Sequence, residues 1–329
     1  MKKLFLLVGV SFALMLFLVV QWTGIRELSA AFLSINPLYI PLIIMLQFAL
    51  LAVYGLRWGL LLGNAGVKAG WRVVFKYVFI GAALNNITPM VRFGGEPVKG
   101  YMLAREASVR KRVVFAAITT DSFITAISLL TYVFFGFLGL LVFSIFNPIV
   151  LYIMIAAILS GLMICLYAFY NESLLAVFAG KLSRLVSRFS RERGEKLAEG
   201  LLGLRREIGK SLRRKDVILK AILLGFAERF LEVIAFYTIF LSMGVGINLY
   251  FCAIVLGVGL IFGLIPLLPG GLVAYESSSI IVLRLMGVSP ALAATSVLLW
   301  RGANYWMITV IGLVIGWWHG VRFALRKHY

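Results

Sequence analysis

Long apolar runs alternate with short polar and basic stretches along most of the chain. A helix needs about 20 residues to cross the roughly 30 Å of hydrocarbon in a bilayer. The runs that approach or exceed this length are 4–20, 38–62, 113–143, 149–170, 217–243 and 290–317. The pattern predicts an all-α polytopic membrane protein with about six full transmembrane helices.

Lysine and arginine gather at the ends of these runs, and their placement predicts the orientation of the chain. Cytoplasmic loops of membrane proteins carry an excess of Lys and Arg. The basic stretches and positions are Lys2, Lys3, Lys68, Arg72, Lys76, Arg105, Arg110, Lys111, Arg112, 181–215, Arg322, Arg326 and Lys327. The bias predicts a multi-pass protein of the cytoplasmic membrane with its N- and C-termini in the cytoplasm.

Two further stretches, 73–112 and 249–289, cannot be simple crossings under this orientation. The first must enter from the cytoplasm and return to it, and the second must do the same from the outer side. Both contain residues that break helices. These are Pro89, Gly94 and Gly95 in the first stretch, and Pro266, Pro269, Gly270 and Gly271 in the second. We therefore predict two re-entrant helical hairpins that enter from opposite faces.

Residues 38–143 and 217–317 follow the same order of helix, hairpin and helix. Because the two halves would cross the membrane in opposite senses, they predict an inverted-topology repeat within a single transmembrane domain over 1–329. Transporters built from such repeats place the substrate site near the midplane, at broken helices. We expect the two hairpins to enclose a polar pocket there.

Residues 171–216 join the two halves as a basic, amphipathic insert on the cytoplasmic side. Apolar residues recur every three or four positions from Leu174 to Phe189, with Lys and Arg on the other face, and a second such helix is predicted from Leu197 to Leu212. Helices of this kind bind anionic lipid headgroups. The alternative is a basic loop that only sets topology.

The composition supports a membrane protein and excludes several other classes. Only 14% of the 329 residues are charged and 62% are hydrophobic, with a mean hydropathy of +1.01, whereas a soluble domain has about a quarter of its residues charged. The net charge of +19 lies in clusters beside apolar runs, so it does not indicate nucleic-acid binding. The two cysteines lie inside apolar runs and the two histidines lie at the C-terminal edge and tail, away from any cysteine or carboxylate cluster, so they give no disulfide framework and no metal-ligand spacing.

Several ionisable residues fall inside the predicted membrane segments, where each charge costs about 2.5–3.5 kcal/mol on insertion scales. Pairing lowers that cost, so Arg57, Asp121, Glu228 and Glu232 are expected to form inter-helix ion pairs or to take part in ion coupling. The signs would allow Arg57 to meet Glu232, and Arg301 to meet Asp121 or Glu228. The alternative is that these pairs only lock helices together.

The two hairpins carry the candidate substrate-binding residues. Arg92 is suited to bind a phosphate through bidentate hydrogen bonds, and backbone N–H groups at the turn would add to an anion site. Glu276 is suited to accept hydrogen bonds from a cationic headgroup or a sugar hydroxyl. The candidates are Arg92, Gly94, Gly95, Glu96, Lys99, Gly270, Gly271, Tyr275, Glu276 and Arg301.

Two stretches carry a family resemblance: TPMVRFGGEPVKGYMLARE at 88–106 and LPGGLVAYESSSIIVLRLMGVSPALAATSVLLWR at 268–301. With them the chain resembles the lysylphosphatidylglycerol synthase transmembrane family, also described as flippase-like or UPF0104-type. The resemblance implies a membrane domain that moves aminoacylated phosphatidylglycerol or that serves polyprenyl-phosphate sugar lipids. The sequence departs from the family at Lys99, where Arg is frequent, and at Val273, where a further glycine is common.

The charged hairpins and this resemblance favour a lipid transporter without its own catalytic domain. It would move a phosphate-containing lipid, aminoacylated or glycosylated, across the membrane by alternating access. The alternatives are a proton-coupled small-solute carrier, and an enzyme or accessory protein of polyprenyl-phosphate metabolism. The sequence shows no aspartate-rich magnesium motif, no histidine at membrane depth and no nucleotide-binding loop, so neither a metal nor a cofactor is expected.

Overall fold

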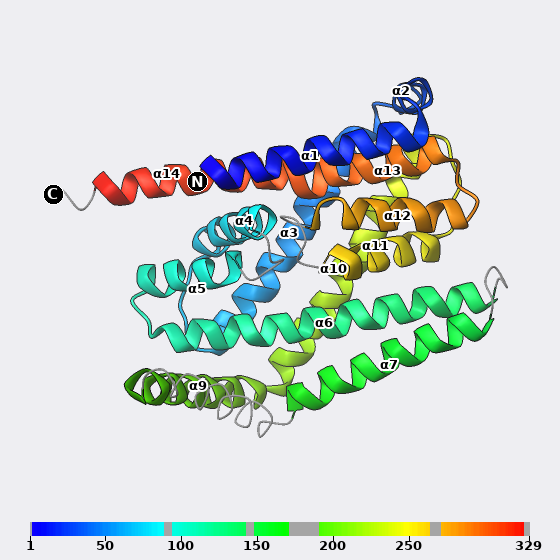
Figure 1. The fold of residues 1–329 in the computed structure, drawn as a ribbon. Helices are drawn as coiled ribbons and strands as arrows, with labels where there is room; N and C mark the ends of the chain where they lie inside the picture. The colour runs from blue at the N-terminus through cyan, green and yellow to red at the C-terminus, as the bar shows by residue number, and fades with distance from the viewer. Residues whose placement is uncertain (1, 89–93, 143–147, 171–190, 264–270, 326–329) are drawn as a thin grey trace.

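The described part of the chain is entirely helical in a computed structural model, which describes residues 2–88, 94–142, 148–170, 191–263 and 271–325 (Figure 1). Arg92 and Gly270 lie outside these ranges, as does the whole amphipathic stretch predicted at 174–189. The helices are α1 (Lys2–Thr23), α2 (Ile25–Leu33), α3 (Tyr39–Asn64), α4 (Trp71–Ile87), α5 (Gly95–Glu106), α6 (Lys111–Val142), α7 (Pro148–Tyr170), α9 (Arg191–Leu212), α10 (Lys215–Ser242), α11 (Leu249–Gly263), α12 (Ala274–Leu285), α13 (Pro290–Arg301), the π-helical turn η2 (Gly302–Met307) and α14 (Ile308–Leu325).

Three helices within the described residues are long and apolar enough to cross a membrane: Tyr39–Asn64, Lys111–Gly139 and Pro290–Gly320. The pair Ala13–Gln21 and Ile25–Leu33, bent by 100°, would make a fourth span. The chain is therefore a polytopic membrane protein, as predicted, and the spans expected at 38–62, 113–143 and 290–317 are confirmed over the described residues.

The other predicted spans are also helical but do not meet the same test over the described residues. The helix α10 covers 217–243 as predicted, yet Glu228, Arg229 and Glu232 lie along its middle. In α7 the described apolar part is limited to Tyr152–Ile164. The expectation of about six full crossings is thus supported for three or four helices.

Two apolar clusters fill the interior, one around α4 and α5 and the other around α11, α12 and α13. On α10 the first cluster ends at Ala221 and the second begins at Val233. The three charged residues of α10 occupy the interval between them. A polar layer therefore separates two hydrophobic cores, at the level where α3 packs against α10.

Both stretches predicted to be hairpins are interrupted helices whose two arms pack against each other. The first consists of α4 and α5, and the second of α11 and α12. In Figure 1 the α4–α5 pair lies toward the end that holds α9 and both chain termini, whereas the α11–α12 pair lies toward the opposite end. Helix α4 ends at Ile87 and α5 begins at Gly95, and Gly271 lies between α11 and α12.

The second glycine of each pair lets the two arms approach closely. A Cβ on Gly95 would meet the backbone carbonyl of Gly81 in α4 and the Asn85 side chain. A Cβ on Gly271 would lie 2.5 Å from the carbonyl oxygen of Gly263 in α11, and Gly271 also has a φ of +67°. Neither position has room for a side chain, so both hairpins depend on glycine for the same contact.

Four helices end in the same capping arrangement. In α3, α10 and α12 a glycine with positive φ follows the last turn, at Gly66, Gly244 and Gly287. The valine after it donates its N–H to the carbonyl five residues earlier, which is a Schellman motif. Helix α5 ends in the same way with Ser108 at φ +52° in place of glycine. The motif thus terminates α3 and α5 in one half and α10 and α12 in the other.

Helix α9 coincides with the second amphipathic helix predicted in the insert. It packs against α6, and its Ile208 is buried. The Asn64 side chain donates a 2.8 Å hydrogen bond to the Ser211 carbonyl and so holds α9 against the end of α3. The apolar face of α9 therefore packs against other helices of the protein, in addition to any contact that it makes with lipid.

Candidate functional site

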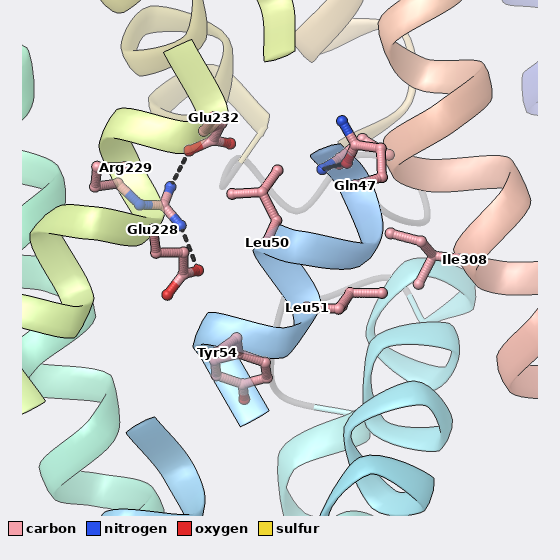
Figure 2. Close-up of a pocket in the computed structure, with 9 residues that line it drawn as sticks. Gln47, Leu50, Leu51, Tyr54, Glu228, Arg229, Glu232 and Ile308 are labelled. Atoms are coloured by element: carbon pink, nitrogen blue, oxygen red, sulfur yellow. Dashed lines mark hydrogen bonds and ion pairs between the residues drawn. The ribbon is translucent and has the colours of Figure 1, made fainter. Parts of the chain in front are cut away.

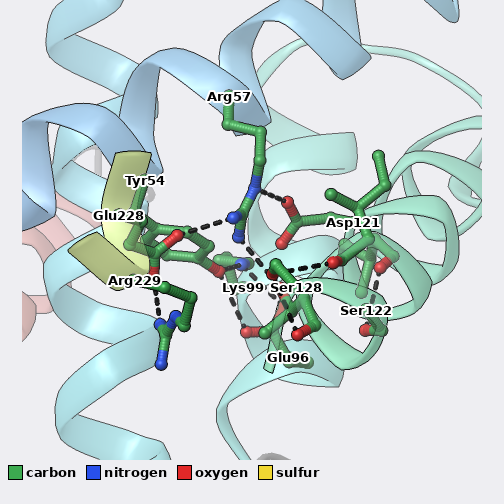
Figure 3. Close-up of polar contacts among 12 residues, drawn as sticks. Tyr54, Arg57, Glu96, Lys99, Asp121, Ser122, Ser128, Glu228 and Arg229 are labelled. Atoms are coloured by element: carbon green, nitrogen blue, oxygen red, sulfur yellow. Dashed lines mark hydrogen bonds and ion pairs between the residues drawn. The ribbon is translucent and has the colours of Figure 1, made fainter. Parts of the chain in front are cut away.

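Five charged side chains form an alternating chain through the polar layer, and the four from Asp121 to Arg229 are labelled in Figure 3. Asp121 accepts a 2.7 Å hydrogen bond from Nε of Arg57, whose Nη1 lies 2.6 Å from Glu228. The other oxygen of Glu228 lies 2.7 Å from Arg229, which in turn lies 2.5 Å from Glu232. The order is negative, positive, negative, positive, negative, so a carboxylate stands at each end.

This chain connects both halves of the molecule, because Asp121 belongs to α6, Arg57 to α3 and the remaining three residues to α10. All five are buried. A buried charge costs several kcal/mol unless it is paired and hydrogen-bonded, and here every neighbour has the opposite sign. Arg57 also donates a 2.9 Å hydrogen bond to Thr125.

The partners differ from those that the sequence suggested. Arg57 pairs with Asp121 and Glu228 rather than with Glu232, and Arg301 pairs with Glu276. Glu232 pairs with Arg229, a residue that the sequence reasoning did not single out. The available signal was its position on the same helix, directly after Glu228 and three residues before Glu232.

The first hairpin brings a carboxylate, an ammonium and aromatic rings together. Lys99 is almost fully buried; its Nζ lies 2.6 Å from Glu96 and donates a 2.7 Å hydrogen bond to the Tyr54 hydroxyl. The same ammonium lies 4.2 Å from the centre of the Trp58 ring, a cation–π contact. The Asn85 side chain of α4 accepts a 2.8 Å hydrogen bond from the N–H of Gly95 and so fixes the start of α5.

The second hairpin repeats this combination with different residues. Glu276, in the first turn of α12, lies 2.5 Å from Nε of Arg301 at the end of α13. The Arg301 guanidinium lies 4.0 Å from the centre of the Tyr305 ring and 4.8 Å from that of Tyr275. The Trp300 indole N–H donates a 3.0 Å hydrogen bond to the Tyr275 hydroxyl. Each hairpin therefore presents a carboxylate that pairs with a buried cation beside aromatic rings.

The two hairpins are linked through the π-helical turn η2, which begins directly after Arg301. The Asn86 side chain of α4 donates hydrogen bonds to the Tyr305 carbonyl at 3.2 Å and to Thr309 at 2.8 Å. The Tyr305 hydroxyl donates in return to the Asn86 carbonyl at 2.7 Å. Isolated π-helical turns inside α-helices are frequent at functional sites, and this one ties the first hairpin to the helix that carries Arg301.

A cavity of about 90 Å³ opens beside α10, between the two hairpin networks (Figure 2). Six of its nine lining residues are charged or polar, and three are apolar. The lining residues are Gln47, Leu50, Leu51, Tyr54, Glu228, Arg229, Glu232, Asn304 and Ile308. Gln47 was not singled out from the sequence, although a lone amide inside the apolar run of α3 was a readable signal.

A further charged cluster lies outside the predicted spans, at the end of the molecule that holds both termini. Glu106, the last residue of α5, accepts hydrogen bonds from Lys76 and Tyr77 of α4, each at 2.5 Å, and lies 3.8 Å from His319 of α14. Burial alone would raise the pKa of the Glu106 carboxyl. The bonds from Lys76 and Tyr77 outweigh burial and lower that pKa below its usual 4.5.

The remaining predicted site positions are accounted for as follows. Gly94 is the N-cap of α5, and a Cβ there would collide with the Thr88 side chain. Val273, where the family commonly has glycine, adopts a φ of +71°, a conformation that β-branched residues rarely take. Within the described residues no group of three His, Cys, Asp or Glu side chains is placed to hold a metal ion.

These features define a class: a multi-pass α-helical membrane protein with two glycine-broken hairpins and a buried charge network between them. Residues 4–312 match the family described as the lysylphosphatidylglycerol synthase TM region, and the chain belongs to that family. The family predicted from the two hairpin motifs is therefore confirmed.

Curated relatives are similar over nearly their whole length. A UPF0104 membrane protein of Methanothermobacter thermautotrophicus is 30% identical over 306 residues, which cover 88% of each chain. A UPF0104 membrane protein of Pyrococcus horikoshii is 27% identical over 325 residues, covering 95% of this chain and 96% of the relative. No solved structure matches the chain.

Proposed function

We propose that the protein is a lipid transporter that moves a phosphate-containing lipid, aminoacylated or glycosylated, across the cytoplasmic membrane by alternating access. In this proposal both termini lie in the cytoplasm. The observation that carries this proposal is the pair of broken hairpins. Each contributes a carboxylate that pairs with a buried cation beside aromatic rings, and the two hairpins lie toward opposite ends of the molecule.

The likeness of the two hairpins supports an inverted-topology repeat with re-entrant hairpins. In both, the second glycine of the pair meets a glycine carbonyl of the first arm. The helices before the hairpins, α3 and α10, end in the same Schellman motif, and so do the second arms, α5 and α12. Repeats of this kind underlie alternating access in other transporters, where broken helices from both halves meet at the substrate.

The carboxylate–cation pairs suggest how a phosphate headgroup would bind. A phosphate oxygen is a strong acceptor for a guanidinium or an ammonium, so it would compete with Glu276 for Arg301 and with Glu96 for Lys99. In the proposal, Arg92 and the N–H groups near Gly94, Gly95, Gly270 and Gly271 complete the anion site, and the displaced carboxylates accept hydrogen bonds from the rest of the headgroup. The ring of Tyr275 packs against the Arg301 guanidinium.

The cavity between the networks suggests which state the structure represents. A volume of about 90 Å³ admits a few water molecules but not a lipid headgroup. Both cations are engaged by carboxylates of their own protein. This is the arrangement expected of a closed, substrate-free state, which would open when a headgroup takes over the cations.

The experiment is a headgroup-exposure assay in vesicles that contain the purified protein. Tail-labelled phosphatidylglycerol is loaded in both leaflets, and the fraction reached by a membrane-impermeant quencher is followed over time. We expect wild-type protein to expose lipid from the inner leaflet, and Glu276→Gln and Arg301→Lys to slow this at least tenfold. Glu199→Gln, an exposed carboxylate on α9, is the matched control and should transport like wild type.

Two outcomes would contradict the proposal. If wild-type protein leaves the inner-leaflet label unquenched, both for phosphatidylglycerol and for a polyprenyl phosphate, the transport function is wrong. Equal rates for wild type, Glu276→Gln and Arg301→Lys would instead remove the second hairpin from the mechanism.

A further inference from the structure

We infer that the cavity beside α10 is a headgroup subsite for a neutral, hydroxyl-bearing group, a vicinal diol of the kind that glycerol and sugars carry. The inference rests on the proposed function and specifies the headgroup that is moved. Its first basis is a buried amide. Gln47 lines the cavity and is fully buried, and among the described residues no group accepts a hydrogen bond from its Nε2.

The orientation of this amide is set by a neighbour that also lines the cavity. The Asn304 side chain donates a 3.4 Å hydrogen bond to Oε1 of Gln47, so Nε2 is the atom left to serve the cavity. Buried polar groups are usually hydrogen-bonded to protein or to ordered water. The occupant of the cavity must therefore offer an oxygen lone pair to Gln47. Water meets this need in the closed state, and a headgroup oxygen would take its place.

The charges around the cavity disfavour an ion as the occupant. Glu228 and Glu232 line it and repel an anion, whereas Arg229, which pairs with both, also lines it and repels a cation. An ammonium would have to compete with this guanidinium for its carboxylates, and a phosphate would face two carboxylates at once. The mixed lining instead suits a hydroxyl, because a hydroxyl accepts a hydrogen bond from Gln47 and donates one to a carboxylate oxygen.

Apolar side chains complete the lining and suit the carbon atoms of such a group. They are Leu50, Leu51 and Ile308, and Figure 2 shows both leucines on the helix that carries Gln47. Sites for small polar groups commonly combine apolar walls with a few polar groups that fix orientation. In this closed state the cavity of about 90 Å³ admits a few water molecules. That is the bulk of the end of a diol rather than of a whole headgroup.

The cavity is connected to both cations that are proposed to bind the phosphate. Tyr54 lines it and accepts a 2.7 Å hydrogen bond from Lys99 of the first hairpin. Asn304 lies in η2, three residues after Arg301. A headgroup whose phosphate is held by either cation would therefore place its hydroxyls in the same cavity. Both access states would share one selectivity site.

The same chemistry separates two headgroups that the proposed function leaves open. Aminoacylation of phosphatidylglycerol converts a hydroxyl of its glycerol into an ester and so removes the diol. It also adds an ammonium, which Arg229 repels. The expected cargo is therefore a lipid whose phosphate carries a glycerol or a sugar with unmodified hydroxyls.

The test uses pairs of lipids that differ in the hydroxyls of the headgroup, added to the purified protein in detergent micelles. Phosphatidylglycerol is paired with phosphatidyl-n-propanol, and a hexosyl phosphoryl polyprenol with its cyclohexyl analogue. The apparent affinity is obtained from the rise in unfolding temperature with lipid concentration. We expect wild-type protein to prefer the hydroxylated member of one pair by about tenfold, the contribution of one or two hydrogen bonds. The pair that shows the preference identifies the source of the diol.

Two variants separate the cavity from the rest of the protein. Gln47→Leu should abolish the preference and keep the affinity for the lipid without hydroxyls. Gln21→Leu, at an exposed glutamine of α1, is the matched control and should keep the preference. Each preference is measured within one variant, so a change in that variant's own stability cancels.

The outcomes distinguish this inference from the proposed function. Equal affinities within both lipid pairs for wild-type protein would overturn the diol site, as would an undiminished preference in Gln47→Leu or tighter binding of lysyl-phosphatidylglycerol than of phosphatidylglycerol. If the preference is present but no lipid moves in the vesicle assay, the transport function is wrong and the diol site stands. If none of these phosphate lipids stabilises the protein, both are wrong.

Discussion

Replacing Gly95 by alanine should separate the two arms of the first hairpin. The added Cβ would lie 2.7 Å from Oδ1 of Asn85 and closer still to the carbonyl of Gly81. Carbon and a carbonyl oxygen come into contact at about 3.3 Å, so α5 must withdraw from α4 by at least about 0.6 Å. The 2.8 Å hydrogen bond from the Gly95 N–H to Asn85 would then lengthen to the limit of a hydrogen bond.

The energetic cost follows from these two effects. Overpacking of a well-packed interior costs about 1–3 kcal/mol, and a buried hydrogen-bonding group left without its partner costs about 1–3 kcal/mol. We expect Gly95→Ala to destabilise the protein by about 2–5 kcal/mol. Because α5 carries both Glu96 and Lys99, its withdrawal should lengthen the hydrogen bond from Lys99 to the Tyr54 hydroxyl of α3, and transport should fall as well.

The assay is thermal unfolding of the detergent-solubilised protein, followed by circular dichroism and by loss of monodispersity. Gly271→Ala should show the same loss, because its Cβ would meet the carbonyl of Gly263. Gly200→Ala is the matched control: this glycine lies inside α9 with no atom near its added Cβ, so alanine should stabilise the helix by up to about 1 kcal/mol. If Gly95→Ala unfolds at the temperature of wild type or above it, the two arms do not approach as closely at Gly95 as described.

Three further predictions concern the ends of the molecule. Ser108→Gly should stabilise the protein by about 0.5–1 kcal/mol in the same unfolding assay, because it removes the left-handed strain of a non-glycine residue at an exposed C-cap; a lower unfolding temperature would contradict this. In a cysteine-free background, Gly246→Cys should react with an impermeant thiol reagent on intact cells and Gly200→Cys only after permeabilisation, whereas labelling of both on intact cells would contradict the orientation. Glu106, with its lowered pKa, contributes stability that is present above its ordinary value of 4.5 and lost as the pH falls below it. Glu106→Gln should therefore flatten the loss of thermal stability in that acidic range, and an unchanged pH profile would refute the role of its bond to Lys76.

The hairpins could be predicted from the sequence because their signals are local. Proline and paired glycine inside an apolar run, with basic residues at both ends, leave few structures that a membrane accepts. The partner of Lys99 was equally local, since Glu96 lies three residues earlier on the same helix. Two helix ends also carry a local signal, because Gly66 and Gly244 directly follow the last turns of α3 and α10.

The pairing of distant charges could not be predicted from the sequence. Arg57 meets Asp121 and Glu228 across 64 and 171 residues of chain, and the choice between Glu228 and Glu232 depends on the position of α10 along its own axis relative to α3. A one-turn difference along a helix leaves both residues on nearly the same face, so the sequence pattern does not separate them. Arg301 met Glu276 instead, because the arm α12 packs directly against α13.

The alternating charge chain restricts how this protein can change through evolution. Loss of any one arginine would leave two acids facing each other in a dry environment, and loss of Glu228 would place two cations in contact. A viable substitution at one position therefore requires a second at its neighbour, which lies on α10 itself for Arg229 and Glu232 and on a different helix for the contacts of Arg57. Across related sequences these five positions should vary in concert, and a relative that carries only one altered member should show a compensating change beside it.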